Sequence, residues 1–138
     1  MSVGICIIAH EPLASALKSC AQHIFSATGD NHCNEIACFD VPNDVEMNEG
    51  EQKARAMIEA LGDRDVLVFT DVVGATPSNI AHRLLDKPNV RVITGTNLPA
   101  LITALSNIDD NISRLTVLVE GAAHGGISSA IGRPSSGN

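Results

Sequence analysis

Two residues with complementary chemistry each follow an apolar segment of the sequence. His10 comes directly after Ile5–Ala9, and Asp71 comes directly after Val66–Thr70. A carboxylate that accepts a hydrogen bond from one ring nitrogen of a histidine leaves the lone pair of the other nitrogen free as a nucleophile. Attack of that nitrogen on phosphorus gives a phosphohistidine, so the pair suggests phosphoryl transfer. The alternative is structural: His10 can be a hydrogen-bonded residue at a strand end, and Asp71 can cap a turn.

The segment after Asp71, DVVGATPSN, contains a turn of small residues. Gly74, Ala75 and Thr76 are candidates to bind phosphoryl oxygens through backbone N–H groups, and Thr76 also offers a hydroxyl. The segment is not a P-loop, because it lacks the GK[ST] ending, and no G-x-G-x-x-G follows the first apolar run. A helix that begins near Pro12 would bring unpaired N–H groups and a partial positive charge to His10.

Metal chemistry is not expected from this sequence. Four residues could suggest a site, but they include no C-x-x-C or H-x-x-x-H pair, and their spacing is poor. These residues are His23, His32, Cys33 and Cys38. His82 and His124 are expected in surface or packing roles.

The candidate residues must be positioned by alternating strands and helices. Apolar runs predict buried strands at residues 3–9 and 66–70, and two further strands are expected at residues 34–39 and 90–94. Helical spacing of apolar residues predicts four helices: one from Leu13 through Ile24, one capped by Asn48, one opened by Pro77 or Ser78, and one through Leu98–Leu105. Residues 113–126 fit either a strand or a helix, and a helix is preferred.

The alternation predicts an α/β domain with a doubly wound, mostly parallel sheet and helices on both faces. Sites in such sheets form at the carboxyl ends of the strands, where His10 and Asp71 both lie. Right-handed crossovers can make the first and third strands neighbours and bring the two residues together. Residues 127–131 are predicted to form a short last strand. The domain therefore covers residues 1–131, and 132–138 are predicted to be a disordered tail.

Composition excludes several classes of function. The 138 residues suit one domain, with a net charge of −7 and only 2% aromatic residues. A nucleic-acid partner would require a basic patch or stacking surfaces, so none is expected. The N-terminus lacks a basic signal-peptide start, and no apolar run is long enough to span a membrane. No direct membrane insertion is expected, and the expected compartment is the cytoplasm.

Three segments, in order along the chain, carry a family resemblance: VGICIIAHEPLASAL, DVLVFTDVVGATPSN and VRVITGTNLPALITAL. Together they resemble the IIA domain of the mannose family of the bacterial phosphoenolpyruvate-dependent sugar phosphotransferase system. The resemblance implies that His10 accepts a phosphoryl group from the carrier protein HPr through Nε2 and passes it to a IIB component for sugar uptake. It implies that Asp71 holds the Nδ1–H and that Thr76 donates to the phosphoryl oxygens. It also implies a homodimer that exchanges the strand at 127–131, with no cofactor.

Three positions depart from the pattern that the chain resembles. Glu11 stands where the family often has glycine, Val73 where some members have an aromatic residue, and Ala75 where the loop has its second glycine. Glu11 is expected to turn to solvent, because a carboxylate beside a dianion opposes phosphorylation. Two other functions stay open. One is a regulatory IIA protein whose phosphorylation state is read by a partner, without sugar transport. The other is a non-catalytic ligand-binding module in which His10 caps a turn.

Overall fold

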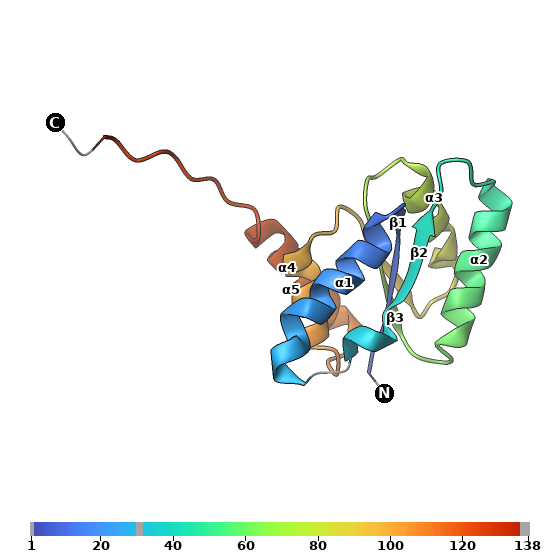
Figure 1. The fold of residues 1–138 in the computed structure, drawn as a ribbon. Coiled ribbons are helices and arrows are strands. Elements are labelled where there is room, and N and C mark those ends of the chain that lie inside the picture. The colour runs from blue at the N-terminus through green and yellow to red at the C-terminus, as the bar shows by residue number, and fades with distance from the viewer. Residues whose placement is uncertain (1, 30–31, 136–138) are drawn as a thin grey trace.

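The computed structural model describes residues 2–29 and 32–135, which form four strands and five α-helices in three layers (Figure 1). The strands are β1 (Gly4–His10), β2 (Ala37–Val41), β3 (Val66–Thr70) and β4 (Val90–Ile93). The helices are α1 (Leu13–Phe25), α2 (Met47–Ala60), α3 (Thr76–Arg83), α4 (Leu98–Ser106) and α5 (Ile112–Gly125), with short 3₁₀ segments at Ser26–Thr28, His32–Glu35 and Leu84–Asp86. Over the described residues, no helix combines the length and apolarity needed to cross a bilayer.

The four strands form one parallel sheet in the order β2-β1-β3-β4. The chain moves from β1 outward to β2 and then crosses back to β3 and β4 on the other side of β1. β1 is therefore central, and its residues are buried up to His10, which is exposed. The prediction that the first and third strands are neighbours is confirmed, because β1 pairs with β3 and Ile8 lies opposite Thr70. This order brings the ends of β1 and β3 side by side.

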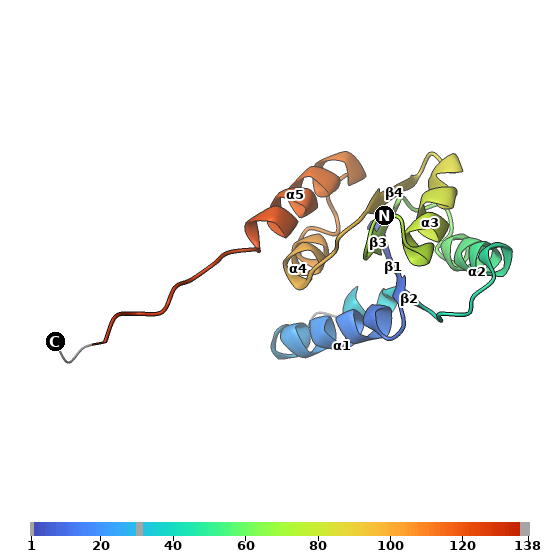
Figure 2. The same cartoon turned by 90° about the horizontal axis from the view of Figure 1, so that it is seen from above.

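Helices cover both faces of the sheet, as Figure 2 shows from above. Neighbouring residues of a strand point to opposite faces, so Ile7 and Ile8 enter two different cores. Ile7 packs with Leu101 of α4 and Leu115 of α5, together with apolar residues of α1. Ile8 packs with Ile58 of α2 and with apolar residues of α3. The predicted α/β class with helices on both faces is thus confirmed.

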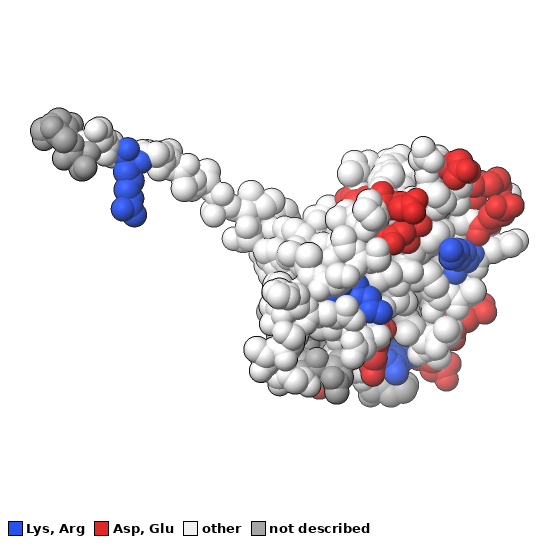
Figure 3. Space-filling view, viewed as in Figure 1, with Lys and Arg blue, Asp and Glu red and all other residues white. Residues whose placement is uncertain are grey.

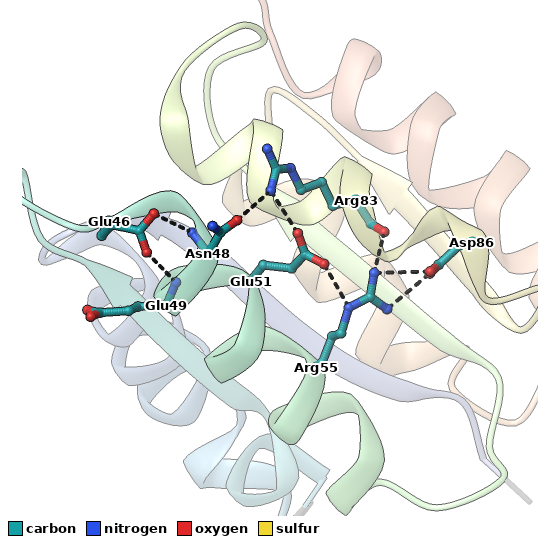
Figure 4. A network of polar contacts seen from close by, with 7 residues as sticks. All are labelled: Glu46, Asn48, Glu49, Glu51, Arg55, Arg83 and Asp86. Carbon is teal, nitrogen blue, oxygen red and sulfur yellow. Dashed lines mark hydrogen bonds and ion pairs between the residues drawn. The ribbon is translucent and has the colours of Figure 1, made fainter.

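An ion-pair network joins α2 to the C-terminal end of α3 (Figure 4). Arg55 donates from Nε to Glu51 at 3.0 Å, from Nη1 and Nη2 to Asp86 at 3.1 and 3.0 Å, and from Nη2 to the Arg83 carbonyl at 3.0 Å. Arg83 donates to the other Glu51 oxygen at 2.9 Å. Every guanidinium nitrogen of Arg55 therefore has an acceptor, and the planar group fixes α3 against α2. The network thereby restrains the helix that begins at Thr76.

The start of α2 differs from the prediction. Glu46, rather than Asn48, is the N-cap residue, and its two carboxylate oxygens accept from the N–H groups of Asn48 at 3.1 Å and Glu49 at 3.0 Å. These two hydrogen bonds hold the pKa of the Glu46 carboxyl below its usual range. The predicted cap at Asn48 is wrong, because a longer carboxylate two residues earlier reaches two amides at once.

Other boundaries shift by a few residues. β2 covers Ala37–Val41 instead of 34–39, because Asn34 lies in a 3₁₀ turn and the pairing with β1 continues to His10 and Val41. Helix α3 begins at Thr76, and β4 ends at Ile93. The helix preferred for 113–126 is confirmed as α5.

The segment after α5 forms no strand in the single chain. Residues 127–135 run away from the body of the molecule in both views (Figures 1 and 2). Ile127 and Ile131 are exposed. A strand needs a partner with free N–H and C=O groups, and this segment does not pair with β4 of its own chain. Its exchange between two copies remains a prediction, as does the disorder of the tail, whose residues 136–138 lie outside the described residues.

Candidate functional site

The candidate site is built on a contact between His10, the last residue of β1, and Asp71, the first residue after β3. Asp71 Oδ2 lies 2.7 Å from His10 Nδ1 and accepts the His10 backbone N–H at 2.8 Å. Asp71 Oδ1 accepts the backbone N–H of Val72 at 2.8 Å. The Asp71 side chain is 9% exposed, whereas that of His10 is 49% exposed. The carboxylate is therefore fixed on three sides, while half of the imidazole faces solvent.

The ionisation state of Asp71 determines the tautomer of His10. Burial raises the pKa of the Asp71 carboxyl, but the backbone and ring hydrogen bonds from His10, with that from Val72, outweigh it and hold this pKa below its usual range. Asp71 is therefore ionised at neutral pH and can only accept hydrogen bonds. The proton of a neutral His10 ring then resides on Nδ1, and the lone pair of Nε2 is free.

The turn after β4 fixes the backbone at Asp71. The N–H of Gly95 donates to the Asp71 carbonyl at 2.6 Å, and the N–H of Thr96 donates to the Thr70 carbonyl at 3.1 Å. Gly95 has a φ of +74°, a conformation that glycine adopts without strain. Asn97 then caps α4 by accepting the Ala100 N–H at 3.0 Å. The GTNLP segment thus supports Asp71 and also starts the next helix.

The same Asn97 side chain links α4 to α5. Its Nδ2 donates to the Ala123 carbonyl in the last turn of α5 at 3.0 Å. One amide group therefore satisfies an N–H at the start of one helix and a carbonyl near the end of another. This side chain thus ties the start of α4 to the end of α5, two helices whose apolar residues share one core.

The small-residue turn has the backbone that its sequence requires. Gly74 has a φ of +87°, where an L side chain is strained. Ala75 has a φ of −80° and a ψ of 163°, so alanine is accommodated without strain at that position. The Ala75 N–H closes the turn by donating to the Val72 carbonyl at 3.2 Å. Thr76 is the first residue of α3, where the backbone N–H has no partner within the helix.

Sequence reasoning missed Asp40, near the end of β2. Its Oδ1 accepts the N–H of Ser15 in the first turn of α1 at 3.0 Å. The amide end of α1 was expected to be available beside His10, but this carboxylate occupies one of its N–H groups. A carboxylate at the carboxyl end of a strand, close in the sheet to the start of a helix, was the signal that could have indicated this contact.

The remaining sequence candidates lie outside this contact. Glu11 is exposed, as expected, and its backbone N–H donates to the Val41 carbonyl at 3.0 Å. Val73 is also exposed. His82 Nδ1 donates to the Ser78 carbonyl one turn earlier in α3 at 2.7 Å. In the portion of the chain that the structure describes, no group of three or more His, Cys, Asp or Glu side chains could hold a metal ion.

Several solved structures share this fold. The chain is similar to the mannose/sorbose-specific IIA subunit of the phosphotransferase system of Enterococcus faecalis, with 22% identity, a TM-score of 0.83 and 98% of each chain covered. It is similar to the phosphotransferase system component EIIA of Streptococcus agalactiae, with 21% identity, a TM-score of 0.78 and coverage of 92% of this chain and 96% of that one. It is also similar to the PTS IIA protein associated with the fucose utilization operon of Streptococcus pneumoniae, with 24% identity, a TM-score of 0.76 and coverage of 94% and 96%. At these identities the likeness establishes the fold.

The family is established by the sequence itself. No curated protein matches the chain. Residues 4–116 match the model of the EIIA-man family, described as the PTS system fructose IIA component. This match covers most of the chain, including β1 with His10, the turn after β3 and the GTNLP segment. The protein is therefore a member of the EIIA-man family, the mannose-family IIA components of the phosphotransferase system.

Proposed function

We propose that this protein is a phosphocarrier that accepts a phosphoryl group on His10 from phosphorylated HPr and passes it to a IIB component for sugar uptake. The observation that carries the proposal is the 2.7 Å contact between His10 Nδ1 and the ionised Asp71, with the imidazole half exposed. The buried carboxylate orients the ring and fixes its proton, and exposure leaves Nε2 accessible to a protein-bound donor. Family membership supports the same role.

The transfer is a substitution at phosphorus. The Nε2 lone pair of His10 forms a new P–N bond while the P–N bond of the donor phosphohistidine breaks, and the donor nitrogen keeps that electron pair. His10 gains positive charge as the bond forms, and the Asp71 carboxylate at Nδ1–H stabilises this charge. The reverse sequence delivers the phosphoryl group to the next histidine. Because the chemistry needs little else, positioning and electrostatics supply most of the catalysis.

The turn after β3 is proposed to bind the phosphoryl oxygens. Thr76 offers a hydroxyl and a free backbone N–H at the start of α3, where the helix dipole favours an anion. Gly74 and Ala75 shape the turn, with Gly74 providing the positive φ. The carboxylate of Asp40 already occupies one amide of α1, so α3 rather than α1 is the helix end assigned to the phosphoryl group.

The proposal is tested by incubating the protein with phosphoenolpyruvate, enzyme I and HPr and measuring its intact mass. The wild-type protein should gain about 80 Da, the mass of one phosphoryl group, in an acid-labile form. The His10→Ala variant should gain nothing while keeping the circular dichroism of the folded protein. A variant without His10 that is still phosphorylated would contradict the proposal. Addition of a IIB component should then discharge the wild-type protein, which a purely regulatory protein would not do.

The exposed strand edge supports the proposed homodimer. β4 is the last strand of the sheet, and a cavity of about 480 Å³ beside it is lined by residues of β4, α5 and the segment that begins at Ile127. The alternation of 127–131 places Ile127 and Ile131 on one side of an extended chain, and both are exposed. We propose that this segment adds to β4 of a second copy in the cytoplasm, which would bury both isoleucines and pair the free edge.

Light scattering tests the dimer. The wild-type protein should have the mass of two chains, and the double variant Ile127→Asp/Ile131→Asp should shift toward one. The double variant Ser128→Asp/Ala130→Asp places the same added charge on the opposite side of the extended segment and serves as the control. A monomeric wild-type protein, or a double variant that remains fully dimeric, would exclude the proposed exchange.

A further inference from the structure

The start of α3, the helix end assigned to the phosphoryl group, follows a residue that cannot cap the helix. Ala75 is the N-cap residue, and its methyl group accepts no hydrogen bond. The amides of the first turn are therefore directed by the position of the helix as a whole. Thr76 and Arg83 are the two ends of this helix. They lie about 10 Å apart, so whatever fixes the far end of α3 also places the groups at its start.

Aliphatic packing holds α3 against the sheet and against α2. Ile80 and Ala81 are fully buried in a core that they share with side chains of β1, β3 and α2. The two helices approach closely at Gly50 of α2, where an added Cβ would lie 2.6 Å from Cδ1 of Ile80. Apolar contacts of this kind are non-directional. They therefore fix the distance between the helices more strongly than the position of α3 along its axis.

Directional contacts at the far end of α3 come from α2. The carbonyl of Arg83, the last residue of α3, accepts from Arg55 Nη2 at 3.0 Å. The Arg83 side chain donates to Glu51 at 2.9 Å, and Glu51 also accepts from Arg55 Nε at 3.0 Å. The side chains of Arg55 and Glu51 are 27% and 23% exposed, so water competes little for these contacts. Both the backbone and the side chain of the last residue of α3 are thereby attached to α2 (Figure 4).

The carboxylates of the network depend on its arginines. Arg83 and Arg55 hold the pKa of the Glu51 carboxyl below its usual range, and Arg55 does the same for the pKa of Asp86. Further acidic side chains gather over α2, on the right of the molecule in Figure 3. Arg55 is the cation that joins Glu51 of α2 to Asp86, which follows α3. Without it, these two carboxylates repel each other, and the end of α3 loses its attachment through the Arg83 carbonyl.

We infer that Arg55 and Glu51 are positioning residues for phosphoryl transfer, acting through α3. They contact the end of α3 opposite to Thr76, so they act without touching the reacting atoms. By fixing the last turn of α3, they hold the first-turn amides and the Thr76 hydroxyl in place relative to His10. Positioning supplies most of the catalysis of phosphoryl transfer, and a displacement of about 1 Å is enough to lower a rate substantially. This inference rests on the proposed function of His10.

The first measurement is the rate of transfer from phosphorylated HPr, followed by quenched flow well below the thermal midpoint of each variant. Arg55→Ala should lower kcat/KM by about 5- to 20-fold. Glu51→Gln, which keeps the shape but weakens both ion pairs, should slow transfer as well. Arg55→Lys should recover only part of the rate, because an ammonium group cannot reproduce the contacts of the planar guanidinium. Arg64→Ala is the control, since it removes the same charge and an ion pair with Glu35 but belongs to neither α2 nor α3, and it should keep the wild-type rate.

The second measurement is the equilibrium of phosphoryl exchange between HPr and this protein. The equilibrium does not depend on how fast the two proteins meet, and it reports how well the site binds the phosphoryl group. Arg55→Ala should shift it toward phosphorylated HPr by about 3- to 10-fold, which corresponds to the loss of one hydrogen bond to the phosphoryl group. A merely structural role of Arg55 would lower the thermal midpoint and leave this equilibrium unchanged.

A double-mutant cycle tests whether Arg55 acts through the start of α3. Thr76→Val removes the hydroxyl that is assigned to the phosphoryl oxygens. Arg55→Ala should slow the Thr76→Val protein less than it slows the wild-type protein, because one of the contacts that it misplaces is already absent. The two residues lie at opposite ends of α3, so such coupling requires the helix between them. An equal slowing in both backgrounds would overturn the inference.

Transfer at the wild-type rate in Arg55→Ala, with a lowered thermal midpoint, would also overturn it, since the network would then support only the fold. An equal loss of rate in Arg64→Ala would do the same, because net charge rather than the position of α3 would then set the rate. These outcomes leave wild-type phosphorylation of His10 intact. A wild-type protein that gains no phosphoryl group would instead remove the proposed function, and the inference with it.

Discussion

Replacement of Asp71 by asparagine tests the central contact of the site most directly. Asparagine has the same shape, but its amide has one oxygen where the carboxylate has two. If that oxygen takes the place of Oδ2, it can still accept from the N–H and ring of His10, which now lie 2.8 and 2.7 Å away. The amide nitrogen then takes the place of Oδ1, which in the wild-type protein accepts the Val72 N–H at 2.8 Å. Two hydrogen-bond donors therefore face each other at this position.

Two separate losses follow from Asp71→Asn. The ring of His10 loses an ionised acceptor, and a hydrogen bond to a charged group contributes about 1.5–3 kcal/mol. Because each 1.36 kcal/mol is about tenfold in rate, phosphoryl uptake should slow by about 10- to 100-fold. The unsatisfied Val72 N–H should cost about 1–2 kcal/mol of folding free energy, since Val72 is exposed and water can replace part of the bond. The thermal midpoint should then fall by about 3–10 °C.

The assay follows the mass gain of about 80 Da over time, well below the thermal midpoint of the variant. Asp63→Asn is the control, because Asp63 is exposed near the opposite edge of the sheet and carries the same charge. The control should match the wild-type protein in rate and midpoint. An Asp71→Asn protein that is phosphorylated at the wild-type rate would refute the argument that the carboxylate stabilises the phosphorylated ring.

Three further predictions concern the support of the site. Gly74→Ala should lower the free energy of unfolding by about 1–2 kcal/mol, because a φ of +87° strains alanine even though the added Cβ has no neighbouring atom. Gly121→Ala in the middle of α5 is the control and should raise stability instead. Equal thermal midpoints for the two variants would contradict the prediction. Asn97→Ala should lower the free energy of unfolding, measured in urea, by about 1–3 kcal/mol, because it removes the cap of α4 and leaves the Ala123 carbonyl without its donor. A change below the error of the measurement would exclude this role of Asn97. The depressed pKa of Asp71 stabilises the fold above the ordinary aspartate value of about 3.9, and this contribution disappears as pH falls through the lower, folded-state value. The stability gap between wild type and Asp71→Asn should therefore narrow below about pH 4, and a gap independent of pH would show that the carboxylate charge is not responsible.

Much of the local structure was predictable because it depends on short-range patterns. Apolar runs gave the two inner strands, β1 and β3, since parallel strands buried on both faces must be apolar throughout. The ambiguous segment at 113–126 is a helix because Leu115 and Val119 lie on one buried face, as a helical repeat requires. Boundaries were less accurate. The start of α2 depended on Glu46, and Asn48 could not be rejected as a cap without knowing which side chain reaches the amides.

The candidate site was only partly visible in the sequence. His10 and Asp71 were found because each follows an apolar strand, and strand ends at the carboxyl edge are where such folds place polar groups. Asp40 was missed, because its contact with Ser15 joins two elements whose relative position is set by the packing of α1 on the sheet. The support of Asp71 by Gly95 was not apparent either, since it depends on where the chain leaves β4.

The sequence by itself determined the elements, the two residues at their ends and the family, because all of these are encoded in periodicity, residue type and motif. The tertiary structure alone decided that Asp71 lies 2.7 Å from His10 with its carboxylate buried. That distance depends on the order β2-β1-β3-β4, which results from the packing of two separate cores on opposite faces of the sheet. Such contacts join residues far apart in the chain, and no local pattern specifies their geometry.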